Sequence, residues 1–60
     1  MVKVNFTFEQ GERITTFSLA FNSVDEALTH GAIMLGVPCD SIVADVYDGD
    51  DWVTTLKKKA

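Results

Sequence analysis

The sequence predicts a small α+β domain of two layers, in which one helix packs on a four-stranded, mainly antiparallel sheet. Two observations predict this class. Segments in which apolar and polar residues alternate, as in half-buried strands, lie on both sides of one capped amphipathic segment. Glycine-containing turn sequences separate the two strands on each side. We therefore expect the order strand, strand, helix, strand, strand within a single domain that covers residues 1–60.

The first two strands form a hairpin. Residues 2–8 alternate, and one face carries only apolar side chains, which are Val2, Val4, Phe6 and Phe8. We predict a two-residue turn at Gln10-Gly11 and a return strand over 13–21, so that Phe8 lies opposite Arg13. This register brings the apolar residues of the return strand to the same face, namely Phe17, Leu19 and Phe21.

The helix is predicted over 22–36. Asn22 and Ser23 are both suitable N-caps, and if Ser23 is the cap, Glu26 three residues later completes a capping box. Gly36 suits a left-handed C-terminal cap, and Pro38 prevents continuation. An apolar stripe should face the sheet, formed by Val24, Leu28, Gly31 and Leu35. The opposite side should be exposed and carries Glu26, Thr29, His30 and Ile33.

The last two strands form a second hairpin, over 41–47 and 52–56. A two-residue loop at Gly49-Asp50 pairs Tyr47 with Trp52. One face then carries Ile42, Ala44, Val46, Val53 and Thr55, and the other carries Val43, Asp45, Tyr47, Trp52, Thr54 and Leu56. We place the first face under the helix, because burial of an unpaired Asp45 would be costly. A different turn register would reverse this choice and make Tyr47 and Trp52 part of the core.

The position of the third strand leaves two sheet orders open. Beside the first strand it gives a fully antiparallel sheet of order 2-1-3-4, and beside the second it gives a mixed sheet of order 1-2-3-4. We favour 2-1-3-4, because antiparallel pairs are commoner and because this order keeps the most apolar strand in the centre.

Composition limits the functions that the chain can have. The chain has 60 residues, of which 47% are hydrophobic, and its net charge of −4 describes a small acidic globular domain. An acidic domain lacks the positive surface on which nucleic-acid binding depends, so we expect no direct nucleic-acid partner. The basic cluster 57–59, Lys57-Lys58-Lys59, is interpreted as a solvated tail.

We expect a cytoplasmic protein. Cys39 is the single cysteine, so no disulfide forms within the chain, as is usual in a reducing compartment. Met1 is followed by an alternating strand rather than by the apolar segment of a signal peptide. No run approaches the roughly 20 apolar residues that cross a bilayer, so a membrane partner is not expected.

The residues that could support catalysis or metal binding lack suitable partners in the sequence. The aspartates of the second hairpin do not have the spacing of a calcium loop. His30 has no nucleophile or second ligand at helical spacing, and Cys39 has no partner for redox or protease chemistry. The short chain should also leave no room for a catalytic cleft of about 300 Å³ or more. We therefore predict no enzymatic activity, no metal and no cofactor.

The predicted partner-binding surface is the open face of the second hairpin together with its acidic turn. Tyrosine and tryptophan are enriched in interface hot spots, and acidic groups steer association with basic surfaces. The surface consists of Val43, Asp45, Tyr47, Asp48, Asp50, Asp51, Trp52 and Leu56. A small, non-enzymatic protein-binding module is the function we infer, although a cross-strand Tyr–Trp pair also serves simply to stabilise a hairpin.

Two kinds of partner fit this surface. The first is a larger protein with a basic surface, for example a nucleic-acid-processing enzyme that the chain would inhibit as a mimic of DNA. The second is another copy of the chain, which would make a self-associating structural homodimer through the open face. Ile33 on the outer side of the helix is a second hint of an adhesive surface.

Residues 17–47 contain a strand, a helix that opens with Asp25-Glu26-Ala27-Leu28, a loop with Gly36-Val37-Pro38 and a strand over 42–47. In this order they resemble small host-takeover proteins of bacteriophages, in particular the T7-type inhibitor of bacterial RNA polymerase. The resemblance covers about half of the chain, and the acidic second hairpin has no counterpart in it. It implies a cytoplasmic inhibitor that binds a host enzyme.

Overall fold

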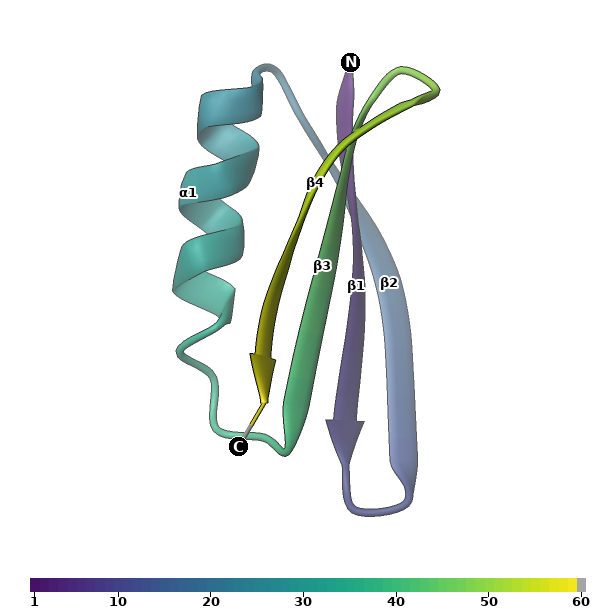
Figure 1. Cartoon of the computed structure of the whole chain (residues 1–60), viewed down its shortest axis with the longest axis vertical. Coiled ribbons are helices and arrows are strands. Elements are labelled where there is room, and N and C mark those ends of the chain that lie inside the picture. Colours follow the sequence, from purple (N-terminus) through teal and green to yellow (C-terminus); the bar gives the residue numbers. More distant parts are fainter. Residues whose placement is uncertain (60) are drawn as a thin grey trace.

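The computed structural model describes residues 1–59 and confirms the predicted fold class. The elements are β1 (Val2–Gln10), β2 (Arg13–Phe21), α1 (Val24–Met34), β3 (Ser41–Asp48) and β4 (Asp51–Lys59). The strands form one antiparallel sheet of order β2-β1-β3-β4, as predicted. Helix α1 covers one face of this sheet, and the two hairpin turns lie at opposite ends of the molecule (Figure 1). The other face, called the open face below, is where the predicted binding surface should lie.

The core lies between α1 and the two central strands, β1 and β3. Its buried side chains are Val2, Val4, Phe6, Ala27, Ile42, Ala44 and Val46. Small residues on the helix allow the two layers to approach closely. At Gly31 the approach is close, because a Cβ atom there would lie 2.9 Å from Cδ1 of Leu56. Leu56 of β4 therefore packs directly under α1.

Helix α1 begins as predicted and ends earlier than predicted. The Ser23 Oγ accepts the backbone N–H of Glu26 at 3.2 Å, which satisfies one of the unpaired donors of the first turn. The helix ends at Met34, and Leu35 is the C-cap in right-handed conformation. The predicted left-handed cap at Gly36 is wrong, since this glycine has no positive φ and its N–H donates to the Ile33 carbonyl at 3.0 Å.

The turn between β1 and β2 lies one residue later than predicted, at Gly11-Glu12. Phe8 consequently pairs with Thr15 rather than with Arg13. The faces are nevertheless as predicted, because a shift of two residues preserves the alternation of side chains. Gly11 has a φ of 61°, as the first position of a type II′ turn requires. Asp40 holds this turn, because its Oδ2 accepts the N–H of Gly11 at 2.7 Å.

The second hairpin confirms the predicted turn at Gly49-Asp50 and the pairing of Tyr47 with Trp52. A β-bulge then shifts β4 by one residue, so that Ala44 pairs with Leu56. The prediction that Leu56 lies on the open face is therefore wrong. One extra residue in one strand moves every later side chain of that strand to the opposite face.

The same bulge corrects the positions of three further residues of β4. Val53, predicted to be core, is the extra residue of the bulge and is 39% exposed. Thr54 lies opposite Val46 on the helix side, whereas Thr55 lies on the open face, the reverse of the prediction for both. Strand β4 also continues to Lys59, so the segment 57–59, predicted to be a solvated tail, belongs to an edge strand.

Candidate functional site

Of the predicted binding residues, Asp45, Tyr47 and Trp52 lie together on the open face near the turn, and Val43 lies on this face farther from the turn. Asp48 and Asp51 are on the helix side, because Asp48 pairs both with the core residue Val2 and with Asp51. Val43, Asp45 and Tyr47 project from alternate positions of β3, and Trp52 lies beside Tyr47 on β4. The exposed carboxylates of the adjoining turn are Asp48, Asp50 and Asp51. The chain reverses in a two-residue type II′ turn in which Gly49 has a φ of 63°, and this turn places Asp50 next to Tyr47.

The indole of Trp52 is both exposed and held in place. Its side chain is 60% exposed, and its Nε1–H donates to Oγ1 of Thr55 at 3.0 Å. The Thr55 hydroxyl in turn donates to Oδ1 of Asp45 at 2.6 Å. Asp45 is half-buried, so this hydrogen bond satisfies one oxygen of a carboxylate that burial would otherwise penalise. The three side chains form a connected polar chain that fixes the orientation of the ring.

A small polar hollow of about 220 Å³ adjoins Tyr47. It is lined by Lys3, Asn5, Tyr47, Gly49 and Asp50. Across the open face, level with Asp45, the Ser18 hydroxyl donates to Oδ1 of Asn5 at 2.6 Å. The two aromatic side chains of this face, Tyr47 and Trp52, lie together next to the turn.

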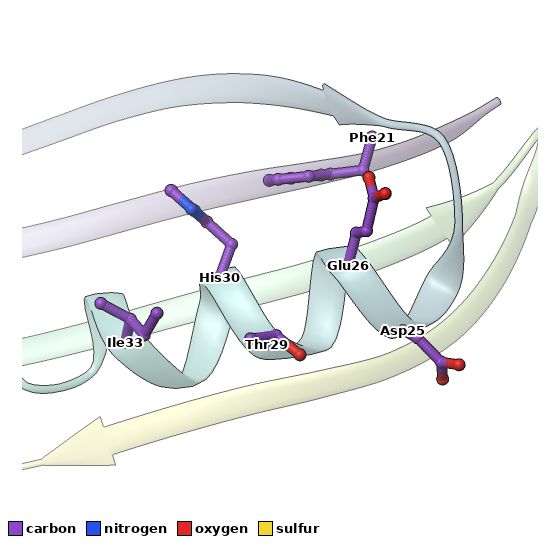
Figure 2. Close-up of a pocket in the computed structure, with 6 residues that line it drawn as sticks. All are labelled: Phe21, Asp25, Glu26, Thr29, His30 and Ile33. Carbon is purple, nitrogen blue, oxygen red and sulfur yellow. The ribbon is translucent and has the colours of Figure 1, made fainter.

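A second surface, which sequence reasoning missed, lies between α1 and β2. It is a shallow hollow of about 420 Å³, lined by Phe21, Asp25, Glu26, Thr29, His30 and Ile33 (Figure 2). The sequence predicted no room for a catalytic cleft of about 300 Å³ or more; this hollow exceeds that volume but is shallow and open. Glu26 and His30 point toward Phe21, whereas Asp25 points away (Figure 2). Ile33 is 67% exposed at the other end of the hollow.

His30 was expected on the exposed side of the helix, and the structure shows it half-buried. The centroid of its ring lies 5.2 Å from that of Phe21 and 6.4 Å from that of Phe6. The helical period alone could not place it, because the position depends on how far α1 lies from the edge of the sheet. One helix of about 10–12 Å diameter cannot cover four strands spaced about 4.8 Å apart. These dimensions therefore predict a hollow at one edge of the sheet, but they do not predict which edge has it.

Metal and thiol chemistry receive little support from the geometry. Among residues 1–59, no group of three or more His, Cys, Asp or Glu side chains is arranged to hold a metal ion. Cys39 is a half-buried free thiol whose Sγ donates to the Ser41 carbonyl at 3.5 Å.

Comparisons with protein-family models, with curated proteins and with solved structures gave no match. The resemblance to phage inhibitors of RNA polymerase therefore stays a prediction. Within the described part of the chain, no helix has the length and apolar character needed to cross a membrane.

Proposed function

We propose that this chain is a non-enzymatic, cytoplasmic protein-binding module that attaches to a basic surface of a larger protein through Trp52 and the acidic turn. The observation that carries the proposal is an exposed indole that is already fixed by a hydrogen bond to Thr55. A side chain ordered before binding loses little conformational entropy when the complex forms. Tryptophan in this state is typical of an interface hot spot.

The charges around Trp52 indicate the kind of surface that it would meet. Asp50 lies in the turn and lines the hollow beside Tyr47, and Asp45 accepts the hydrogen bond from the Thr55 hydroxyl that holds the ring. Asp51 precedes Trp52 in β4 and adds negative charge from the other face of the hairpin. A lysine or arginine of the partner could stack on the indole as a cation–π contact and pair with a neighbouring carboxylate. The hollow beside Tyr47 offers space for a second side chain of the partner. The aromatic and acidic groups together therefore complement a cationic surface of the partner.

An inhibitor of a nucleic-acid-processing enzyme is the most concrete form of this proposal. Such enzymes have basic channels, and a small acidic protein that occupies the channel excludes the nucleic acid. The resemblance of residues 17–47 to phage inhibitors of a host polymerase supports the same class of partner.

Self-association through the open face was the alternative drawn from the sequence. Charge argues against it in this geometry. Two copies that meet through their Trp52 ends would bring the acidic turn 48–51 of one copy toward the same turn of the other. Like charges placed opposite one another disfavour such a contact.

The proposal is tested with Trp52→Ala. A wild-type affinity column first isolates the partner from a bacterial lysate, and titration calorimetry then measures its affinity for purified variants. Because Trp52 is exposed, we expect the variant to fold with nearly wild-type stability. Loss of a hot spot of about 2 kcal/mol should weaken binding about 30-fold. Ile14→Ala is the matched control, since Ile14 is an exposed apolar residue elsewhere on the open face.

The charge component is tested by Asp50→Asn combined with Asp51→Asn. We expect slower association and a weaker dependence on salt, because these exposed carboxylates act over the Debye length rather than by direct packing. Wild-type affinity in Trp52→Ala, or binding that does not respond to salt, would contradict the proposal.

A further inference from the structure

Strand β2 is an edge strand that is left uncovered in two ways. One side of its backbone faces no strand in the described part of the chain, so alternate N–H and C=O groups point outward. Its helix-side apolar residues are also incompletely covered, and Phe17 and Leu19 are each 37% exposed. Residues Arg13 through Ala20 are all exposed. An edge that offers both backbone groups and apolar side chains is suited to pairing with another strand.

Strand β2 has few of the features that oppose such pairing. The strand has the sequence RITTFSLAF, without lysine or proline, and its register with β1 is regular from Gln10–Arg13 to Val2–Phe21. Lysines, prolines and bulges are the features by which edge strands avoid pairing. Strand β4, at the other edge, has both a bulge and the lysines of segment 57–59. The two edges therefore differ, and β2 is the one open to addition of a strand.

We infer that β2 is the interface of a symmetric homodimer, in which the β2 strands of two copies pair antiparallel about Phe17. This register pairs all nine residues of the strand. It places Phe17 of one copy opposite Phe17 of the second, Thr15 opposite Leu19, and Arg13 opposite Phe21. The inference is independent of the function proposed above, because it leaves Trp52 and the acidic turn free.

Charge complementarity selects a second copy of this chain as the occupant. Arg13 is the one lysine or arginine of β2 and α1, and it lies at one end of β2 on the helix side. The hollow with Phe21 and Glu26 lies at the other end of the same strand (Figure 2). In an antiparallel two-fold dimer, the Arg13 end of each β2 strand lies beside the Phe21 end of the β2 strand in the other copy. Both ends of the interface are then satisfied at once, as an isologous contact requires.

The chemistry of the hollow suits a guanidinium group. Phe21 provides an aromatic face on which a guanidinium can stack, and Glu26 points toward Phe21 from the first turn of α1. In the dimer, Arg13 of the second copy projects from the strand position beside Phe21, on the same face of the joined sheet. It can therefore reach the Glu26 carboxylate and form a charge-assisted hydrogen bond.

The centre of the interface is apolar. Phe17 already stacks on Phe6, with ring centroids 5.1 Å apart, so its exposed edge is held in a fixed orientation. Pairing about Phe17 places the two copies of this ring next to each other and covers the Leu19 side chains. Exposed Ile33 on α1 lies near the same edge, at the rim of the hollow. The dimer thus buries apolar surface that the single chain leaves in water.

The first test is the mass in solution, measured by sedimentation equilibrium from about 10 µM to about 1 mM, a range that covers the affinities of small interfaces. We expect the mass to rise from one chain to two with concentration. Amide hydrogen exchange on the same samples locates the interface. The Gln10–Arg13 pair that closes the turn is hydrogen-bonded, so the amides of every second residue from Ile14 onward point away from β1. Thr16 and Ser18 are two of these residues, and their amides should become protected only at high concentration.

The second test is a charge exchange that fixes the register. Arg13→Glu and Glu26→Arg should each weaken the dimer about tenfold, because each symmetric dimer contains the pair twice. The double variant should recover most of the wild-type affinity. Lys58→Glu and Asp50→Arg make the same charge changes away from β2 and should leave the mass profile unchanged. All of these positions are exposed, so loss of folding does not confuse the result.

Three results would overturn the inference. The first is a mass of one chain at every concentration, which would mean that β2 is free to pair with an extended segment of another protein. A dimer without protection of Thr16 and Ser18 would place the contact elsewhere, for example on the open face. A dimer that is weakened by both single variants and is not recovered by the double variant would refute the pairing of Arg13 with Glu26.

Discussion

Strands β2 and β4 lie at the two edges of the same sheet, yet they differ in charge, regularity and packing. Strand β4 carries the lysines of segment 57–59 and pairs with β3 through a bulge, whereas β2 carries one charged residue, Arg13, and pairs regularly. Highly charged or bulged edges resist addition of a strand, and regular edges with few charges permit it. The sheet is therefore protected against growth on one side and open to it on the other.

The difference is also visible within one row of side chains that crosses the sheet under the helix. The row consists of Leu56, Ala44, Phe6 and Phe17, from β4 to β2. Gly31 of α1 lies against Leu56 at the β4 end, and Phe17 at the β2 end is left partly in water. The helix is too narrow to cover both ends. We therefore expect Leu56 to contribute to folding alone, whereas Phe17 should contribute to folding and to association.

The largest effect should come from the β4 end of this row. Leu56→Ala removes a side chain that packs against the core, and we expect it to lower the free energy of unfolding by about 2–3 kcal/mol. The loss should be the same at low and high protein concentration. Urea denaturation, followed by circular dichroism at two concentrations, measures both quantities. Val53→Ala on the same strand is the control, and its exposed bulge position predicts a much smaller loss. Equal losses for the two variants would disprove the bulged register of β4.

The β2 end should respond in a different way. Phe17→Ala loses contacts with Phe6 and Phe8, and its partial exposure predicts a smaller cost of about 1–2 kcal/mol in dilute solution. The difference from the wild type should grow with protein concentration, because only the wild type gains stability from the dimer. Thermal denaturation across a concentration series measures this. A difference that stays constant would mean that Phe17 acts in the fold alone, and would remove the proposed contrast between the edges.

The parts of the fold that were predicted from the sequence depend on local patterns. Ser23 and Glu26 were recognisable as the start of a helix, and the faces of the first hairpin followed from alternation. The turn position was missed because a shift from Gln10-Gly11 to Gly11-Glu12 leaves every side chain on the same face. The bulge at Val53 was missed because an extra residue has no signature in a strand that already mixes apolar and polar residues.

The residues of the site that were predicted correctly likewise depend on local patterns. The pairing of Tyr47 with the exposed Trp52 was predicted because it adjoins a turn with a strong signal, and Leu56 was misplaced because it lies beyond the bulge. The hollow beside Phe21 and the open edge of β2 were not predicted at all. Strands β1 and β2 carry similar alternating patterns, and only their lateral positions in the sheet decide which of them is covered. Burial at an edge is a property of the assembled sheet rather than of any one segment.

The smallest effect should come from removal of the protection at β4. Lys57→Thr combined with Lys58→Thr replaces exposed charges and should change the free energy of unfolding by less than about 0.5 kcal/mol. We expect association through β4 to increase, so that species larger than a dimer appear in sedimentation velocity. An increase in association would be informative, because the loss of two positive charges changes the net charge from −4 to −6. Stronger mutual repulsion alone would reduce association.

Lys3→Thr provides the matched control for this last prediction. Lys3 is an exposed lysine of the central strand β1, where no edge is available. Its loss changes the charge in the same direction but should leave the mass profile as it is in the wild type. If the double variant also keeps the wild-type profile, the bulge at Val53 is sufficient to block the β4 edge, and the lysines are not needed. If both variants form larger species, total charge rather than the edge controls association, and the distinction between β2 and β4 fails.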